Sequence, residues 1–111
     1  MAVGVSAAAL TAETLERWLA GRTERGPAAL RARVLEHAAA VGDAASPAER
    51  IALAAERVLA IVEEHPGDRS IALDLLAADA LITLALLAQA ETAPERLGQF
   101  AESLLAAERI A

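Results

Sequence analysis

Three polar residues stand where the neighbouring sequence is apolar: His37, Asp74 and Asp79. His37 falls in the middle of the apolar face that its segment presents at about 100° per residue. The two aspartates lie in the run 71–88, whose only other polar residue is Thr83. A histidine beside a carboxylate in an apolar pocket can orient a ligand or act as a general acid–base couple. His37, Asp74 and Asp79 are therefore a candidate ligand-binding polar site.

The same three residues can instead be structural. Burying a bare carboxylate costs several kcal/mol, so each aspartate must find a partner, reach solvent or take up a proton. Asp74 lies near the start of its run and could meet Arg69 or Arg22, whereas Asp79 would need a neighbouring arginine, His37 or a group across a dimer interface. Because buried ion pairs often fix register and oligomeric state, we expect the structural role.

Other kinds of chemistry find no support in the sequence. Without cysteine there is no disulfide, thiol nucleophile or thiolate metal site. The two histidines, His37 and His65, occur in neither a His-x3-His nor a Glu-x-x-His pattern, so the spacing does not favour a metal site. No serine stands in a Gly-x-Ser-x-Gly motif, and the glycines are scattered. We expect no catalytic residue, no metal and no cofactor.

The composition points to a helical, water-soluble protein. Of the 111 residues, 31 are alanine and 17 leucine, and only Trp18 and Phe100 are aromatic. Sixteen acids outnumber ten arginines, which gives a net charge of −6 and argues against binding nucleic acid. A chain this apolar is not intrinsically disordered. It carries no signal-peptide pattern, and we expect a cytoplasmic protein.

Turn and cap signals divide the chain into five predicted helices. Residues 1–10 carry no charge and no turn chemistry, and we interpret them as a flexible arm before a single domain over 11–111. Periodic apolar positions at i, i+3 and i+4 then predict an all-α bundle. The predicted helices span 12–21, 27–41, 47–65, 69–90 and 94–109.

Several residues are predicted to cap these helices. Thr11 is an N-cap candidate for the first, and Asp68 for the fourth. The segments 46–49 and 92–95 each read as a capping box that contains proline. His65 closes the third helix and is predicted to act there as a C-terminal cap rather than as a ligand.

The fourth helix, 69–90, is apolar in every direction, and such a helix must be buried all round. The other four helices could wrap it, or part of it could lie in a homodimer interface. We expect the dimer, because four short stripes of alanine, valine and leucine are too few to cover every face. Membrane spanning is disfavoured by the two aspartates and by the absence of an aromatic belt and basic flanks.

Together these observations predict a compact bundle of about five helices with a central apolar helix. The expected function is that of a non-enzymatic interaction or scaffold protein, self-associating through the central helix and open to a further protein partner. The alternative is a bundle that binds a small apolar ligand beside His37, Asp74 and Asp79, with weak acid–base activity.

Overall fold

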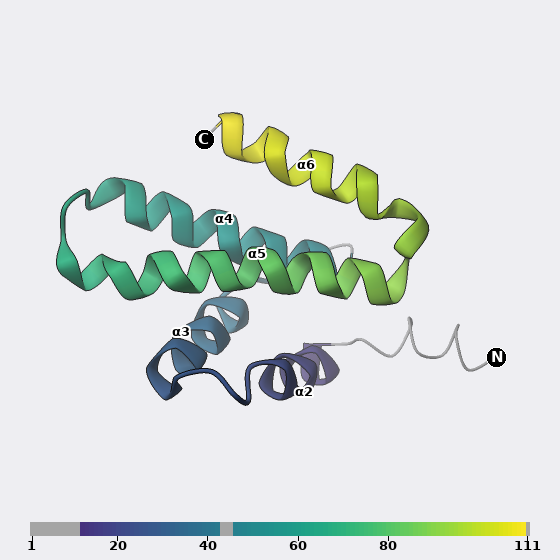
Figure 1. Ribbon diagram of the computed structural model, residues 1–111, viewed down its shortest axis with the longest axis horizontal. Helices are drawn as coiled ribbons and strands as arrows, with labels where there is room; N and C mark the ends of the chain where they lie inside the picture. The colour runs from purple at the N-terminus through teal and green to yellow at the C-terminus, as the bar shows by residue number, and fades with distance from the viewer. Residues whose placement is uncertain (1–11, 43–45, 111) are drawn as a thin grey trace.

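The computed structural model describes residues 12–42 and 46–110, with side chains over 14–42 and 46–106. The predicted arm and its cap at Thr11 lie outside these ranges. The described residues form five α-helices, two short 3₁₀ turns and no strand, so the predicted all-α bundle is confirmed (Figure 1). In chain order the elements are α2 (Ala12–Arg22), α3 (Ala28–Ala39), α4 (Pro47–Glu64), η1 (Arg69–Ile71), α5 (Ala72–Thr92), η2 (Pro94–Arg96) and α6 (Leu97–Ile110).

An antiparallel pair of helices, α4 and α5, forms the middle of the fold. Figure 1 shows α2 and α3 on one side of this pair and α6 on the other. The facing surfaces of α4 and α5 are largely alanine, which lets the two backbones approach closely. Larger side chains fill the spaces on either side. The buried residues are Leu15 and Leu19 on α2, Val34 and Ala38 on α3, Ala48, Ile51, Ala52, Ala54, Ala55 and Val58 on α4, and Ala77, Ala78, Leu81, Leu84, Ala85 and Ala88 on α5.

Three of the predicted caps are present. The backbone N–H of Glu49 donates to the hydroxyl oxygen of Ser46 at 3.1 Å, which caps α4. The backbone N–H of Ser70 donates to a carboxylate oxygen of Asp68 at 3.0 Å, at the start of η1. His65 ends α4, and its Nδ1–H donates to the carbonyl of Ile61 at 2.9 Å. Local sequence signals therefore located these helix ends correctly.

The second predicted capping box, 92–95, was wrong. Thr92 is the last residue of α5, and its hydroxyl donates to the carbonyl of Ala88 at 2.9 Å instead of capping the next helix. Ala93 takes the N-cap position of η2, without a side-chain hydrogen bond. A threonine can bond back to the carbonyl four residues earlier, so the alanine-rich helix continues through it.

The central position of α5 is confirmed, but its burial on every side is not. α5 contacts α3, α4 and α6, and the face opposite this core remains open. Leu75 is 51% exposed and Leu76 is 56% exposed. The hydropathy of a helix indicates that its faces need cover, but it does not say whether that cover comes from the same chain.

The open face also bears on the membrane expectation. Within the described residues, Arg69–Thr92 is the one helical stretch long and apolar enough to cross a membrane by length and composition. Its mean hydropathy is 2.1, and 39% of its most apolar window is buried inside the fold. The core helix of a soluble protein passes the same test, so this finding alone is weak evidence for a membrane.

Candidate functional site

The structure brings two of the three candidate residues together, on α3 and α5. The Nε2–H of His37 donates to Oδ1 of Asp74 at 2.9 Å. The same oxygen accepts a hydrogen bond from Nη1 of Arg33 at 3.0 Å. Arg33 and His37 are four residues apart on α3, so both side chains reach the same point on α5. The arginine that pairs with Asp74 is therefore Arg33, and not Arg69 or Arg22.

The position of Asp74 explains how a carboxylate is accommodated inside this bundle. Its side chain is only 8% exposed, and that of His37 is 13% exposed. Asp74 lies in the first turn of α5, where the helix dipole stabilises a negative charge. Arg33 supplies a positive charge while its own side chain stays 37% exposed and retains part of its hydration. Each of the three side chains therefore has a hydrogen-bond partner within the cluster, as in a structural ion pair.

Asp79 does not join this cluster. It lies on the opposite face of α5 and is exposed to solvent, so the expectation that it needs a buried partner was wrong. Five residues along an α-helix correspond to about 500°, which turns Asp79 by roughly 140° away from Asp74. The hydroxyl of Thr83 donates to the backbone carbonyl of Asp79 at 3.2 Å, so this bond leaves the Asp79 carboxylate free to face solvent.

A polar contact that sequence reasoning missed joins α2 to the end of α5. The indole N–H of Trp18 donates to Oε1 of Glu91 at 3.1 Å, and Arg22 forms an ion pair with the other carboxylate oxygen. The guanidinium carbon of Arg22 also lies 5.3 Å from the centre of the Trp18 ring. The sequence showed Trp18 only as part of an apolar stripe. The i, i+4 spacing of Trp18 and Arg22 was the available signal.

The carboxylate of Asp68 accepts two hydrogen bonds from Ser70 at the start of η1. The hydroxyl and backbone N–H of Ser70 donate to its carboxylate, and they hold the pKa of Asp68 below its usual value. Since the folded pKa lies below the unfolded one, this contribution to stability is present above the unfolded pKa and is lost as the pH falls through the folded pKa.

Replacing Ser70 by alanine is expected to raise the pKa of Asp68 toward its ordinary value, because the hydroxyl donor to the carboxylate is removed. An NMR titration of the Asp68 carboxyl carbon measures this shift. Ser103→Ala is the matched control, since the Ser103 hydroxyl donates to the carbonyl of Phe100 on α6 and should not affect Asp68. An unchanged Asp68 pKa in Ser70→Ala would contradict the assigned cause.

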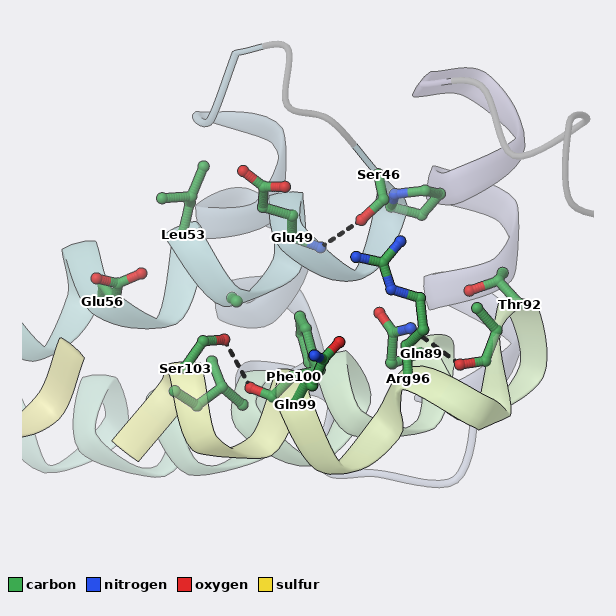
Figure 2. A pocket seen from close by; sticks show the side chains of 14 residues that line it. Ser46, Glu49, Leu53, Glu56, Gln89, Thr92, Arg96, Gln99, Phe100 and Ser103 are labelled. Carbon is green, nitrogen blue, oxygen red and sulfur yellow. Dashed lines mark hydrogen bonds between the residues drawn. The ribbon is translucent and has the colours of Figure 1, made fainter. Parts of the chain in front are cut away.

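One cleft separates α6 from the beginning of α4 and the end of α5. It encloses about 770 Å³, and Figure 2 shows Glu49, Arg96 and Gln99 among its lining residues. The hydrogen bonds drawn there are local ones: Ser46 to Glu49, Gln89 to Ala93 and Ser103 to Phe100. None of these three bonds connects one wall of the cleft to the other.

Two further clefts are mainly apolar. One of about 740 Å³ lies between α2 and α3 and reaches Arg50. The other, of about 200 Å³, lies beneath α6, and we call it the apolar cleft. Its larger lining residues are Leu59, Ile82, Leu86, Leu104 and Leu105. None of these three clefts is lined by His37, Asp74 or Asp79.

The outward face of α5 is open, and we call it the α5 stripe. It consists of Ala72, Leu75, Leu76, Asp79, Thr83, Leu86, Leu87 and Ala90. The first five are exposed and the last three are half-buried. At 3.6 residues per turn these positions fall within about 60° of one line along the helix, opposite the buried Leu81. Two adjacent leucines that are each more than half exposed form an apolar patch on this face, and such patches often mark interaction surfaces.

Comparison of the chain with protein-family models, with curated proteins and with solved structures finds no match. Among the residues with described side chains, no three His, Asp or Glu groups lie close enough together to hold a metal ion.

Proposed function

We propose that this protein is a non-enzymatic interaction protein that associates with a second copy of itself through the α5 stripe. The observation that carries the proposal is the adjacent exposure of Leu75 and Leu76 on the most apolar helix of the fold. Removing such leucines from water is favourable by about 25 cal/mol for each Å² buried. A second α5 offers a matching apolar surface, whereas the remaining exposed helix faces of the chain carry many charges.

The buried Arg33–His37–Asp74 cluster supports a structural rather than an enzymatic interpretation. Arg33 and His37 both donate to one carboxylate oxygen of Asp74, and none of the three side chains lines any of the three clefts. A general acid–base couple needs a substrate within hydrogen-bond reach. The cluster instead ties α3 to the first turn of α5, which holds the outward face of that helix in place.

Replacing Leu76 by glutamate is expected to raise the dissociation constant of the dimer at least tenfold, because a charge is placed in the apolar contact. Light scattering over a series of concentrations up to tens of micromolar measures the molar mass. Leu105→Glu is the matched control, since Leu105 is 53% exposed on α6 and lies outside the α5 stripe. A monomeric wild-type protein over this range, or equal effects of both variants, would contradict the proposal.

A second candidate function is the binding of a small apolar ligand, favoured by the apolar cleft beneath α6. Its volume of about 200 Å³ suits a short aliphatic chain or a one- or two-ring aromatic group. A naphthalene dye whose fluorescence rises in apolar surroundings is expected to bind there. Ala101→Trp, which places a large ring in the lining, should reduce the dye signal at least severalfold if the dye uses this cleft. An unchanged signal would exclude the apolar cleft as the binding site.

A further inference from the structure

We infer that the two copies meet with their α5 helices antiparallel and with a twofold axis at the level of Leu81, an inference that rests on the proposed self-association. The partner of the α5 stripe is thus a second α5 stripe in a defined register. Residue i of one copy then lies at the level of residue 162 − i of the other, which follows from placing the axis at residue 81.

The α5 stripe is nearly symmetric about Leu81 in its residue types. Along its centre line come Ala72, Asp79, Thr83 and Ala90, all within about 20° of that line on the helix. Reversing this order about residue 81 places alanine opposite alanine and the aspartate opposite the threonine. An isologous contact requires this kind of self-complementarity, because every contact occurs twice.

The leucines that flank the centre line obey the same symmetry. Leu75 and Leu86 lie on one side of the line, and Leu76 and Leu87 lie on the other. A twofold axis across two antiparallel helices keeps each flank facing the same flank of the partner. Leu75 therefore meets the partner's Leu86, and Leu76 meets the partner's Leu87. The half-buried leucines of one copy then cover the exposed leucines of the other.

The single charge in the α5 stripe decides between antiparallel and parallel pairing. In a parallel pair each Asp79 would face the partner's Asp79 directly, and two like charges would be brought into an apolar contact. In the antiparallel pair the two carboxylates are offset by about 6 Å along the helix axis. Each carboxylate then lies opposite the partner's Thr83, whose hydroxyl would exchange its bond to the carbonyl of Asp79 in its own helix for one to this carboxylate.

Spin labels at the two ends of α5 test the arrangement without altering the stripe. The chain has no cysteine, so Arg69→Cys and Glu95→Cys each provide one labelling site, and both positions are exposed. In the antiparallel pair, a label at either position lies about 35–40 Å along the helix axis from the same label on the partner. In a mixed sample, a label at 69 and the partner's label at 95 should lie nearly side by side. Pulsed electron-spin distance measurements report both separations.

Thr83→Val provides an independent test through affinity. It keeps the shape of the side chain and removes the hydroxyl that faces the partner's Asp79, so the dissociation constant is expected to rise about three- to tenfold. Thr92→Val is the control, since its hydroxyl makes the same kind of bond to the carbonyl four residues earlier but lies outside the stripe. Circular dichroism verifies that both variants remain helical. A Thr83→Val dimer as tight as the wild type would overturn the assigned contact.

The outcomes separate the inference from the proposed function. Short distances between like labels, with a dimeric mass, would overturn the antiparallel register and leave self-association standing. Separations of about 15 Å between labels at 69 would place the axis near residue 74 and would overturn the register in the same way. A monomeric mass with no intermolecular distance would overturn both.

Discussion

Replacing Leu81 by alanine is expected to lower the free energy of unfolding by about 3–5 kcal/mol. Leu81 is fully buried in the middle of α5. Its neighbours on the buried face of the helix are Ala77, Ala78 and Ala85, which are too short to collapse into the space that the leucine leaves. The residual cavity adds to the lost transfer free energy, which places the effect at the upper end for such a substitution.

Denaturant unfolding followed by circular dichroism measures this loss. Leu105→Ala is the control, because the same change at a residue 53% exposed on α6 should cost about 0.5 kcal/mol or less. If the two variants lost similar stability, Leu81 would not be the centre of the core, and the packing of α5 against α3 and α4 would be refuted.

Replacing Asp74 by alanine is expected to cost about 2–3 kcal/mol of stability. The substitution removes the acceptor from both His37 and Arg33 and leaves the nearly buried imidazole without its partner. Arg33 is more than one-third exposed and can recover part of its hydration, so the loss stays below that for a fully buried ion pair.

Asp79→Ala, a substitution on the same helix, is the control for Asp74→Ala. Asp79 is exposed, and its removal should change the stability of the monomer by less than about 0.5 kcal/mol. Thermal and denaturant unfolding at low protein concentration measure both variants without a contribution from association. Equal losses for Asp74→Ala and Asp79→Ala would contradict the distinction drawn between a buried structural carboxylate and an open one.

Local chemistry made the helices predictable. Ser46, Asp68 and His65 act on backbone groups within four residues, so the sequence alone placed those helix ends. The periodic spacing of alanine and leucine is also a local signal, and it predicted the all-α class. The capping box predicted at Thr92 is wrong because a threonine hydroxyl can either accept from a backbone N–H of the next helix or donate to the carbonyl four residues earlier. Here it donates to the carbonyl of Ala88, and α5 continues through Thr92.

The candidate site was only partly predictable because it depends on contacts between distant segments. His37 and Asp74 were identified as misplaced polar groups, and they do meet, although 37 residues separate them. Arg33 was not singled out, since nothing local distinguishes it from the other arginines. The different fates of Asp74 and Asp79 follow from which face of α5 the other helices cover, and periodicity on a helix apolar all round does not reveal that face.

The exposed face of α5 links these results to function. The Arg33–His37–Asp74 cluster and the alanine contacts with α4 fix one face of the helix inside the bundle. Leu75 and Leu76 are thereby held outward on a rigid element. A rigid apolar surface loses little conformational entropy when a partner covers it, which favours association.

Amide-resonance NMR of the full chain over a dilution series shows directly whether a second copy covers the α5 stripe. We expect concentration-dependent changes for residues 72–90, largest near Leu75 and Leu76, with the amides of α2 and α3 unaffected. Spectra that do not change between micromolar and millimolar concentrations in a protein that light scattering finds monomeric, or changes centred on α6, would contradict self-association through this stripe.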